Sequence, residues 1–336
     1  MMHRRSLLAA IAAIAAGPAW GEEAAPALEA HEHATGGRIG LYAENLKSGA
    51  KIAWRADERF AMCSSFKASV AACVLARIDR GEDGLDQIVP FDQKDIQEYS
   101  PVAKANLAKG GLSVAEACRG AVELSDNTCA NLLVARIGGP AALTDFWRAT
   151  GDAVTRLDHY EPEMSRSQPP YPSDTTSPAA MAGSLRRFTL GDVLSSGSRA
   201  LLTGWMRDCK TGTDLLRAGM PAGWAIADKT GSNGRDVVGD IAVARRHRRG
   251  LAGAGRAHRH GGVHARRIGH DASAAPASRR AREADRRTPL AVVSAAGRQA
   301  RFAAAVRMST KASSVMPGWA PSRAAVSLTW ERTPSR

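Results

Sequence analysis

Residues 245–336 contain too few large apolar side chains to build a packed core. Only 11 of these 92 residues are Leu, Ile, Val or Phe, whereas a packed domain needs roughly 20%. Arginine, histidine, alanine, glycine and serine dominate the stretch instead. We therefore expect the folded part of this 336-residue chain to lie within residues 1–244 and the tail 245–336 to be disordered.

The same tail carries the excess positive charge of the chain. Residues 245–336 hold 20 Lys or Arg against 4 Asp or Glu, and the remaining residues hold 26 against 29. The formal net charge of +13 therefore does not indicate a nucleic-acid partner for residues 1–244. The tail has no aromatic interleaving and no recognised nucleic-acid-binding motif, so anion binding by the tail is an alternative that rests on composition alone.

The first 21 residues have the pattern of a secretory signal peptide. A basic start is followed by an apolar run, and small residues precede the expected cleavage site before Glu22. The apolar run is shorter than the about 20 residues needed to cross a bilayer. We therefore expect a secreted or periplasmic protein without a membrane span, and Arg4-Arg5 leaves a twin-arginine export route open.

Strand patterns lie at both ends of residues 37–244, and helical patterns lie between them. Residues 37–62 contain two strand-like runs around a turn, and "GWAIADKTGSNGRDVVGDIAVA" has a strand-turn-strand pattern. The segment "SSFKASVAACVLARIDRG" is apolar almost all round, which is typical of a buried helix. Residues 155–180 are polar and rich in proline, as in a long functional loop. The order predicts an α/β sheet domain with an all-helical companion.

Three short motifs could carry serine chemistry. Ser64-Ser65-Phe66-Lys67 is an S-x-x-K at the start of the buried helix, where residues three apart share a face and their side chains can meet. A serine is a poor nucleophile until a base takes its proton, and a partly desolvated lysine can be that base. Ser125-Asp126-Asn127 and Lys229-Thr230-Gly231 follow in this order. S-x-x-K alone is a weak signal, but the joint occurrence of all three is not expected by chance.

The set S-x-x-K, S-D-N and K-T-G resembles that of class A β-lactamases and penicillin-binding proteins. The sequences at 156–165 and 173–182 resemble the omega loop of class A β-lactamases, with Glu161 in the place of their general base. The resemblance runs from about residue 37 to residue 244. It implies an antiparallel sheet flanked by helices plus an all-helical domain, and hydrolysis of β-lactam antibiotics by a serine β-lactamase.

The sequence patterns at the two ends and the resemblance between them together divide the chain. The expected segments are a signal peptide at 1–21, the N-terminal part of the α/β domain at 22–62, an all-helical domain with the omega loop at 63–200, the C-terminal part of the α/β domain at 201–244, and the arginine-rich tail at 245–336. The expected partners are β-lactam small molecules. A monomer is expected, with no metal, no cofactor and no nucleic acid.

The catalytic roles implied by the resemblance fall on four residues. Ser64 attacks the lactam carbonyl and becomes acylated, and its proton goes to Lys67 or, through a water, to Glu161. Ser125 relays a proton to the departing ring nitrogen. Glu161 then activates the water that releases the product. The backbone N–H groups of Ser64 and Ser232 form the oxyanion hole.

The implied substrate-binding residues lie in three other stretches. Asn127 binds the side-chain amide of the substrate, Tyr99 resembles an aromatic gate, and the carboxylate side of the substrate lies against K-T-G and the serine after it. The full expected set is Tyr99, Asn127, Lys229, Thr230, Gly231 and Ser232.

Several positions depart from the family pattern. Ser165 replaces the usual asparagine beside the hydrolytic water, and His159 replaces an arginine that pairs with the loop aspartate, here Asp174. Because only a protonated histidine makes that ion pair, the loop is expected to be looser at pH 8 than at pH 5. The two positions that usually supply an arginine to the substrate carboxylate are Val238 and Leu215. Arg235 is then a candidate substitute.

The abrupt change after "GDIAVA" suggests a reading-frame shift near residues 243–250. The family needs another strand and a C-terminal helix after this point, and a shifted chain would lose both together with its activity. A genuine basic extension is the alternative to a frame shift. The alternatives to β-lactam hydrolysis are a D,D-peptidase-like penicillin-binding protein and an inactive product whose basic tail binds anions. Sequencing the coding DNA beyond codon 235 checks the hypothesis, because a second frame should encode an apolar strand and an amphipathic helix.

Overall fold

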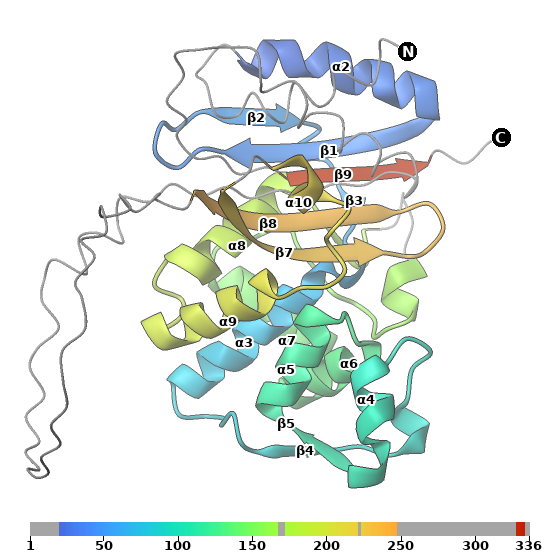
Figure 1. Ribbon diagram of the computed structural model, residues 1–336, viewed down its shortest axis with the longest axis vertical. Coiled ribbons are helices and arrows are strands. Elements are labelled where there is room, and N and C mark those ends of the chain that lie inside the picture. Colours follow the sequence, from blue (N-terminus) through green and yellow to red (C-terminus); the bar gives the residue numbers. More distant parts are fainter. Residues whose placement is uncertain (1–19, 167–171, 221–222, 247–326, 333–336) are drawn as a thin grey trace, which may run out of the picture.

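A five-stranded antiparallel sheet occupies one side of the molecule, and helices contact it from two directions (Figure 1). The computed structural model describes residues 20–166, 172–220, 223–246 and 327–332. The strand order is β2-β1-β9-β8-β7. The strands are β1 (Gly37–Glu44), β2 (Lys51–Trp54), β7 (Trp224–Ser232), β8 (Val238–Arg246) and β9 (Ser327–Arg332).

Most of the described helices form a bundle below the sheet in Figure 1. Helix α2 (Trp20–Thr35) packs against β1 and β2, whereas α8 packs against β1 and β8, and α9 packs against β7. Two small sheets pair β3 (Phe60–Ala61) with β6 (Thr175–Thr176) and β4 (Ile88–Pro90) with β5 (Gly111–Ser113). The other helical elements are η1 (Cys63–Phe66), α3 (Lys67–Asp79), η2 (Gln93–Asp95), α4 (Pro101–Asn106), η3 (Leu107–Lys109), α5 (Val114–Glu123), α6 (Asn127–Arg136), α7 (Pro140–Ala149), η4 (Glu163–Arg166), α8 (Pro178–Leu190), α9 (Ser196–Arg207) and α10 (Leu216–Gly219).

Helix α3 is the centre of the bundle. Every residue from Lys67 to Ala76 is buried, and α5, α6, α8 and α9 all contact this helix. A helix that is apolar on every side must have neighbours on every side, so the expected buried helix is confirmed. Because α3 follows directly on η1, the S-x-x-K serine lies just before a helix whose first ten residues are all buried.

The sequence also predicts the sheet and the long loop correctly in outline. The two runs in 37–62 and the two runs after residue 223 form β1, β2, β7 and β8. The loop expected at 155–180 contains only η4 and β6 before α8 begins at Pro178, and its residues 167–171 lie outside the described residues. The predicted fold, an antiparallel sheet flanked by helices plus a helical region, is confirmed.

Strand β9 comes from the arginine-rich tail. Its six residues pair with β1, from Gly37↔Arg332 to Tyr42↔Ser327, and with β8, from Val238↔Trp330 to Asp240↔Leu328. The tail therefore supplies an interior strand. The expectations that the whole tail is disordered and that the altered chain lacks a strand after β8 are wrong for residues 327–332, because pairing with β1 and β8 places a segment that its composition does not predict. The rest of the tail, 247–326 and 333–336, lies outside the described residues, and so does the segment in which the C-terminal helix would fall.

We expect β9 to be essential for stability. A chain that ends at residue 326 leaves the facing backbone groups of β1 and β8 unpaired, at a cost of roughly 1 kcal/mol per buried hydrogen bond. Such a sum is comparable to the ~5–15 kcal/mol that keeps a domain folded. The measurement is urea unfolding followed by circular dichroism. A chain that ends at residue 332 is the control, and equal midpoints for the two chains would show that β9 does not pair in solution.

Candidate active site

The nucleophile candidate Ser64 lies in η1, at the junction of the sheet and the helical bundle. Ser64 is 8% exposed and borders the main cavity of the described residues. Its predecessor Cys63 has a φ of 42°, in the left-handed region that side chains other than glycine rarely adopt. Such a conformation persists only where the surrounding structure enforces it, so the backbone that carries Ser64 is held in a fixed orientation.

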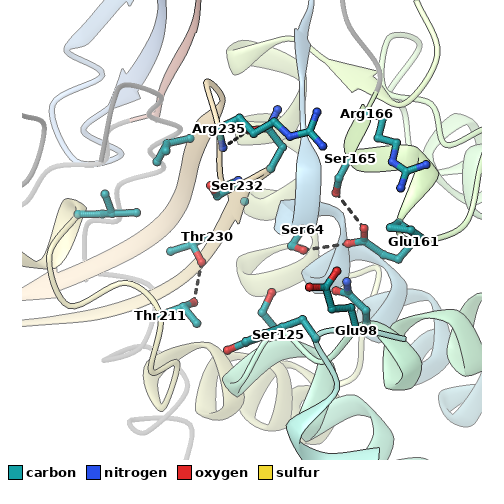
Figure 2. A pocket seen from close by; sticks show the side chains of 18 of the residues that line it. Ser64, Glu98, Ser125, Glu161, Ser165, Arg166, Thr211, Thr230, Ser232 and Arg235 are labelled. Atoms are coloured by element: carbon teal, nitrogen blue, oxygen red, sulfur yellow. Dashed lines mark hydrogen bonds between the residues drawn. The ribbon is translucent and has the colours of Figure 1, made fainter. Parts of the chain in front are cut away.

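The side chains of Ser64 and Lys67 both contact a third residue, Glu161. The Ser64 hydroxyl donates a hydrogen bond of 2.9 Å to Glu161 Oε1 (Figure 2). Lys67 Nζ lies 3.2 Å from the same oxygen. The S-x-x-K spacing brings the two side chains to one place, as expected, but the omega-loop carboxylate joins them. Both candidate bases for Ser64 are therefore in one hydrogen-bonded cluster.

Lys67 is completely buried and has two further acceptors. Its Nζ donates to the backbone oxygen of Ser125 at 2.8 Å and to Asn127 Oδ1 at 2.5 Å. Burial lowers the pKa of Lys67, while the charge of Glu161 opposes that shift. A lysine that gives up its proton more readily than usual can act as a base.

The S-D-N segment is anchored by its middle residue. Asp126 is fully buried; its Oδ1 accepts from Cys129 N at 2.8 Å, and its Oδ2 accepts from Val102 N at 2.8 Å and Ala103 N at 3.0 Å. The carboxylate thus caps α6 and joins it to α4. Ser125, with a φ of 58°, is held in the orientation that this anchor sets.

Lys229, on strand β7, donates a hydrogen bond to the side chain of Ser125. Its Nζ donates to Ser125 Oγ at 3.0 Å and to the backbone oxygen of Thr230 at 2.7 Å. Burial lowers the pKa of Lys229 to about 8. The hydroxyl of Ser125 therefore lies next to a cation that can supply a proton near neutral pH.

Gly231 allows β7 to pass close to η1. A Cβ at this position would lie 2.4 Å from the backbone oxygen of Met62, a contact that no side chain can occupy. The close approach brings the end of β7, with Ser232, against the segment that carries Ser64. The two segments whose N–H groups, at Ser64 and Ser232, are expected to form the oxyanion hole are therefore neighbours.

The strand that carries K-T-G is supported by buried acids. Arg217 Nε donates to Asp228 Oδ1 at 2.5 Å, and Leu216 N donates to Asp240 Oδ2 at 3.2 Å. Burial raises the pKa of both carboxyl groups, that of Asp240 well above its ordinary value. Arg217 is therefore occupied behind β7 and does not reach the substrate side.

Glu161 is fixed through its backbone as well as its side chain. Asn131 Oδ1 accepts from Glu161 N, and Asn131 Nδ2 donates to the Glu161 backbone oxygen, both at 2.9 Å. Ser165 Oγ donates to Glu161 Oε2 at 2.8 Å. The motifs do not include Asn131, and its only sequence signal is its place one helical turn after Asn127.

His159 makes the contact predicted for it. Its Nδ1 lies 2.7 Å from Asp174 Oδ2, and Asp174 Oδ1 accepts the backbone N–H groups of Asp158 and His159 at 2.7 and 3.0 Å. The hydrogen bond to Asp174 raises the pKa of His159. The fully buried Asp174 thus closes the base of the loop that carries Glu161.

The expected residues surround one cavity of about 1020 Å³. Lys67 and Lys229 lie buried beneath it, and Thr230 Oγ1 is 2.6 Å from Thr211 Oγ1 at its left end in Figure 2. Tyr99, 51% exposed, borders it. The predicted residues that line the cavity directly are Ser64, Tyr99, Ser125, Asn127, Glu161, Thr230, Gly231 and Ser232.

Two absences hold for the part of the chain that the structure describes. It contains no group of three or more His, Cys, Asp or Glu side chains placed to hold a metal ion. None of its helices combines the length and the apolar character needed to cross a membrane.

Comparison with known proteins agrees with this geometry. The model of a family described as the β-lactamase enzyme family matches residues 23–254. An ancestral class A β-lactamase (GNCA) is 41% identical, with a TM-score of 0.68 over 85% of this chain and 98% of that one. A protein assigned to class A β-lactamases, PenP from Rhodopseudomonas palustris, is 47% identical, with a TM-score of 0.64 over 66% of this chain and 84% of that one.

The raised pKa of His159 predicts a pH-dependent omega loop. Its stabilising contact with Asp174 is fully present below the unfolded histidine pKa of about 6.5, and it is lost as the pH rises through the higher folded value. We expect limited proteolysis within the loop to be about two- to fivefold faster at pH 8 than at pH 5, as for a partly exposed ion pair. Rates are normalised to His159→Arg, which keeps its charge at both pH values. Equal normalised rates would refute the prediction.

Proposed function

The chain belongs to the class A β-lactamase family and is a serine β-lactamase, and from this premise we propose that it hydrolyses β-lactams through an acyl-enzyme on Ser64 that Glu161 releases. One observation carries the proposal: Ser64 Oγ and Lys67 Nζ both contact Glu161 Oε1. Nucleophile, buried lysine and omega-loop carboxylate thus form a single proton-transfer unit.

Acylation begins when Ser64 Oγ attacks the lactam carbonyl carbon. Its proton passes to the neutral form of Lys67, which the lowered pKa of this lysine makes accessible. The proton moves either directly or by way of Glu161, which is 2.9 Å from Ser64 Oγ and 3.2 Å from Lys67 Nζ. Lys67 is then an ammonium, and Glu161 is again a carboxylate. The carbonyl oxygen becomes an oxyanion that the N–H groups of Ser64 and Ser232 stabilise, a contribution of roughly 3–4 kcal/mol per donor.

Ring opening needs a proton on the leaving nitrogen. Ser125 is the donor, because its hydroxyl accepts a hydrogen bond from Lys229 Nζ and therefore directs its own proton elsewhere. Lys229, whose pKa is lowered to about 8 by burial, replenishes that proton without a large penalty. The C–N bond breaks and the substrate stays attached to Ser64 as an ester.

Acylation itself prepares the second step. Once Ser64 Oγ is an ester oxygen it has no proton to donate, so Glu161 Oε1 becomes free to accept a hydrogen bond from water. Glu161 Oε2 keeps its contact with Ser165, which holds the carboxylate in place. Glu161 takes a proton from the water as the water attacks the ester carbonyl. It passes this proton to Ser64 Oγ when the ester bond breaks, which releases the product and restores the serine hydroxyl.

Substrate orientation follows from the remaining hydrogen-bonding groups. Asn127 Oδ1 is taken by Lys67, which leaves the Asn127 amide N–H₂ to donate to the side-chain carbonyl of the substrate. Thr230 and Ser232 face the other end of the cavity and bind the substrate carboxylate, with the charge of Lys229 beneath them. Export from the cytoplasm is part of the proposal and is supported by the pattern of residues 1–21.

Glu161→Gln is expected to separate the two steps. The amide cannot accept a proton from water, so kcat for benzylpenicillin should fall by about 10²–10⁴-fold, the usual size of a general-base contribution. Mass spectrometry of the intact protein should show the penicilloyl adduct persisting on this variant. Ser64→Ala, which cannot form the adduct, is the control.

Two other outcomes would contradict the proposal. Turnover by Glu161→Gln at the unaltered rate would remove Glu161 from the mechanism. A persistent adduct on the unaltered protein would favour the D,D-peptidase-like alternative, in which acylation is not followed by hydrolysis.

A further inference from the structure

Two arginines border the cavity without a role in the proposed chemistry. Arg235 lies in the turn between β7 and β8, and Arg166 lies at the end of η4. Figure 2 shows the Arg235 guanidinium extending toward the side of the cavity that holds Ser165 and Arg166, away from Thr230 and Thr211. Arg235 is therefore not placed at the carboxylate end, where the sequence suggested that it substitutes for the missing arginine.

The Arg235 side chain is exposed and has no hydrogen-bonding or ion-pair partner among the described residues. The guanidinium of Arg166 is 3.4 Å from Glu163, its neighbour on the same helical turn, and both side chains are more than half exposed. Pairs of this kind are weak, so Arg166 can exchange that partner for another anion. Two cationic groups thus converge on one wall of the cavity.

The acidic residues of the cavity lie elsewhere. Glu98 is on the opposite side of Glu161 from the two arginines in Figure 2. Glu161 is buried and bonded to Ser64, Lys67 and Ser165. Asp214, which also lines the cavity, belongs to the segment that carries Thr211, and Thr211 lies at the other end of the cavity from the two arginines in Figure 2. The two guanidinium groups therefore make this part of the wall positive, and the one carboxylate among the described residues that contacts them is the exposed Glu163 beside Arg166.

This positive wall lies at the end of the cavity that receives the amide side chain of a β-lactam. Ser165 marks this end, opposite Thr211 and Thr230 (Figure 2). Asn127, the expected partner of the amide, lines the cavity and is linked to Glu161 through Lys67. We propose that Arg166 and Arg235 are specificity residues that favour β-lactams whose amide side chain carries an anionic group, such as a carboxylate. The inference rests on the proposed function, because it uses the same substrate orientation.

The effect should be moderate and sensitive to salt. Both guanidinium groups are exposed, so each contributes as a partly solvated charge rather than as a buried one. Attraction between exposed charges is screened over about 8–10 Å at ordinary ionic strength. Added sodium chloride should therefore reduce the preference for the anionic substrate more than it changes turnover of the neutral one.

Carbenicillin and benzylpenicillin are suitable probes, because they differ only by one carboxylate on the side chain. The measured quantity is the ratio of kcat/KM for carbenicillin to kcat/KM for benzylpenicillin. Arg235→Gln and Arg166→Gln should each lower this ratio by about two- to fivefold, and the double variant should lower it further. Arg235→Lys, which keeps the charge, should restore most of it.

Arg207→Gln is the matched control, because Arg207 is an exposed arginine on α9 that does not line the cavity. Its ratio should equal that of the unaltered protein. A ratio that neither cavity variant changes would overturn the inference, while hydrolysis of benzylpenicillin would still support the proposed function. If neither penicillin is turned over, the rates at which each one acylates Ser64 are measured by mass spectrometry. The ratio of these two rates is then used in place of the ratio of kcat/KM values. No adduct with either penicillin would overturn both proposals.

Discussion

The buried contact between Lys67 and Glu161 is the constraint on which the site depends. Two opposite charges withdrawn from water are stable only if the remaining hydrogen-bonding capacity of both is satisfied. The backbone oxygen of Ser125 and the side chain of Asn127 accept hydrogen bonds from Lys67. The hydroxyls of Ser64 and Ser165 donate hydrogen bonds to the carboxylate of Glu161. The residues that carry the chemistry are therefore also the residues that make the buried charges tolerable, which explains why three distant segments of the chain must meet here.

Much of this site could be predicted from the sequence, because its chemistry requires certain residue types at short spacings. Ser64 and Lys67 are three residues apart, and S-D-N and K-T-G are contiguous. The contacts that support these motifs, in contrast, join residues that are far apart in the sequence. Asn131 holds Glu161 across 30 residues, and Asp126 reaches back to Val102 and Ala103. An asparagine or aspartate in a helical stretch has no distinctive pattern until the fold shows its partner.

The sheet shows the same division between local and distant information. Strands β1, β2, β7 and β8 follow from alternation and turn residues within short windows. Strand β9 does not, because six residues in an arginine-rich tail carry little pattern and gain their place from the two strands that flank them. The position of Arg235 is a further case, since the direction of a long side chain in a turn is decided by what surrounds it.

The pairing of β1 with β9 joins a strand that is synthesised early to one that is synthesised last among the described elements. β1 leaves the ribosome early, whereas its partner is synthesised only after the whole helical bundle, β7 and β8. The two central hydrogen-bonded edges of the sheet therefore stay open throughout translation. Contacts between residues so far apart in sequence form slowly, and open edges expose the nascent chain to aggregation. Such a chain has a long interval in which chaperones or a translocation channel can engage it before it closes.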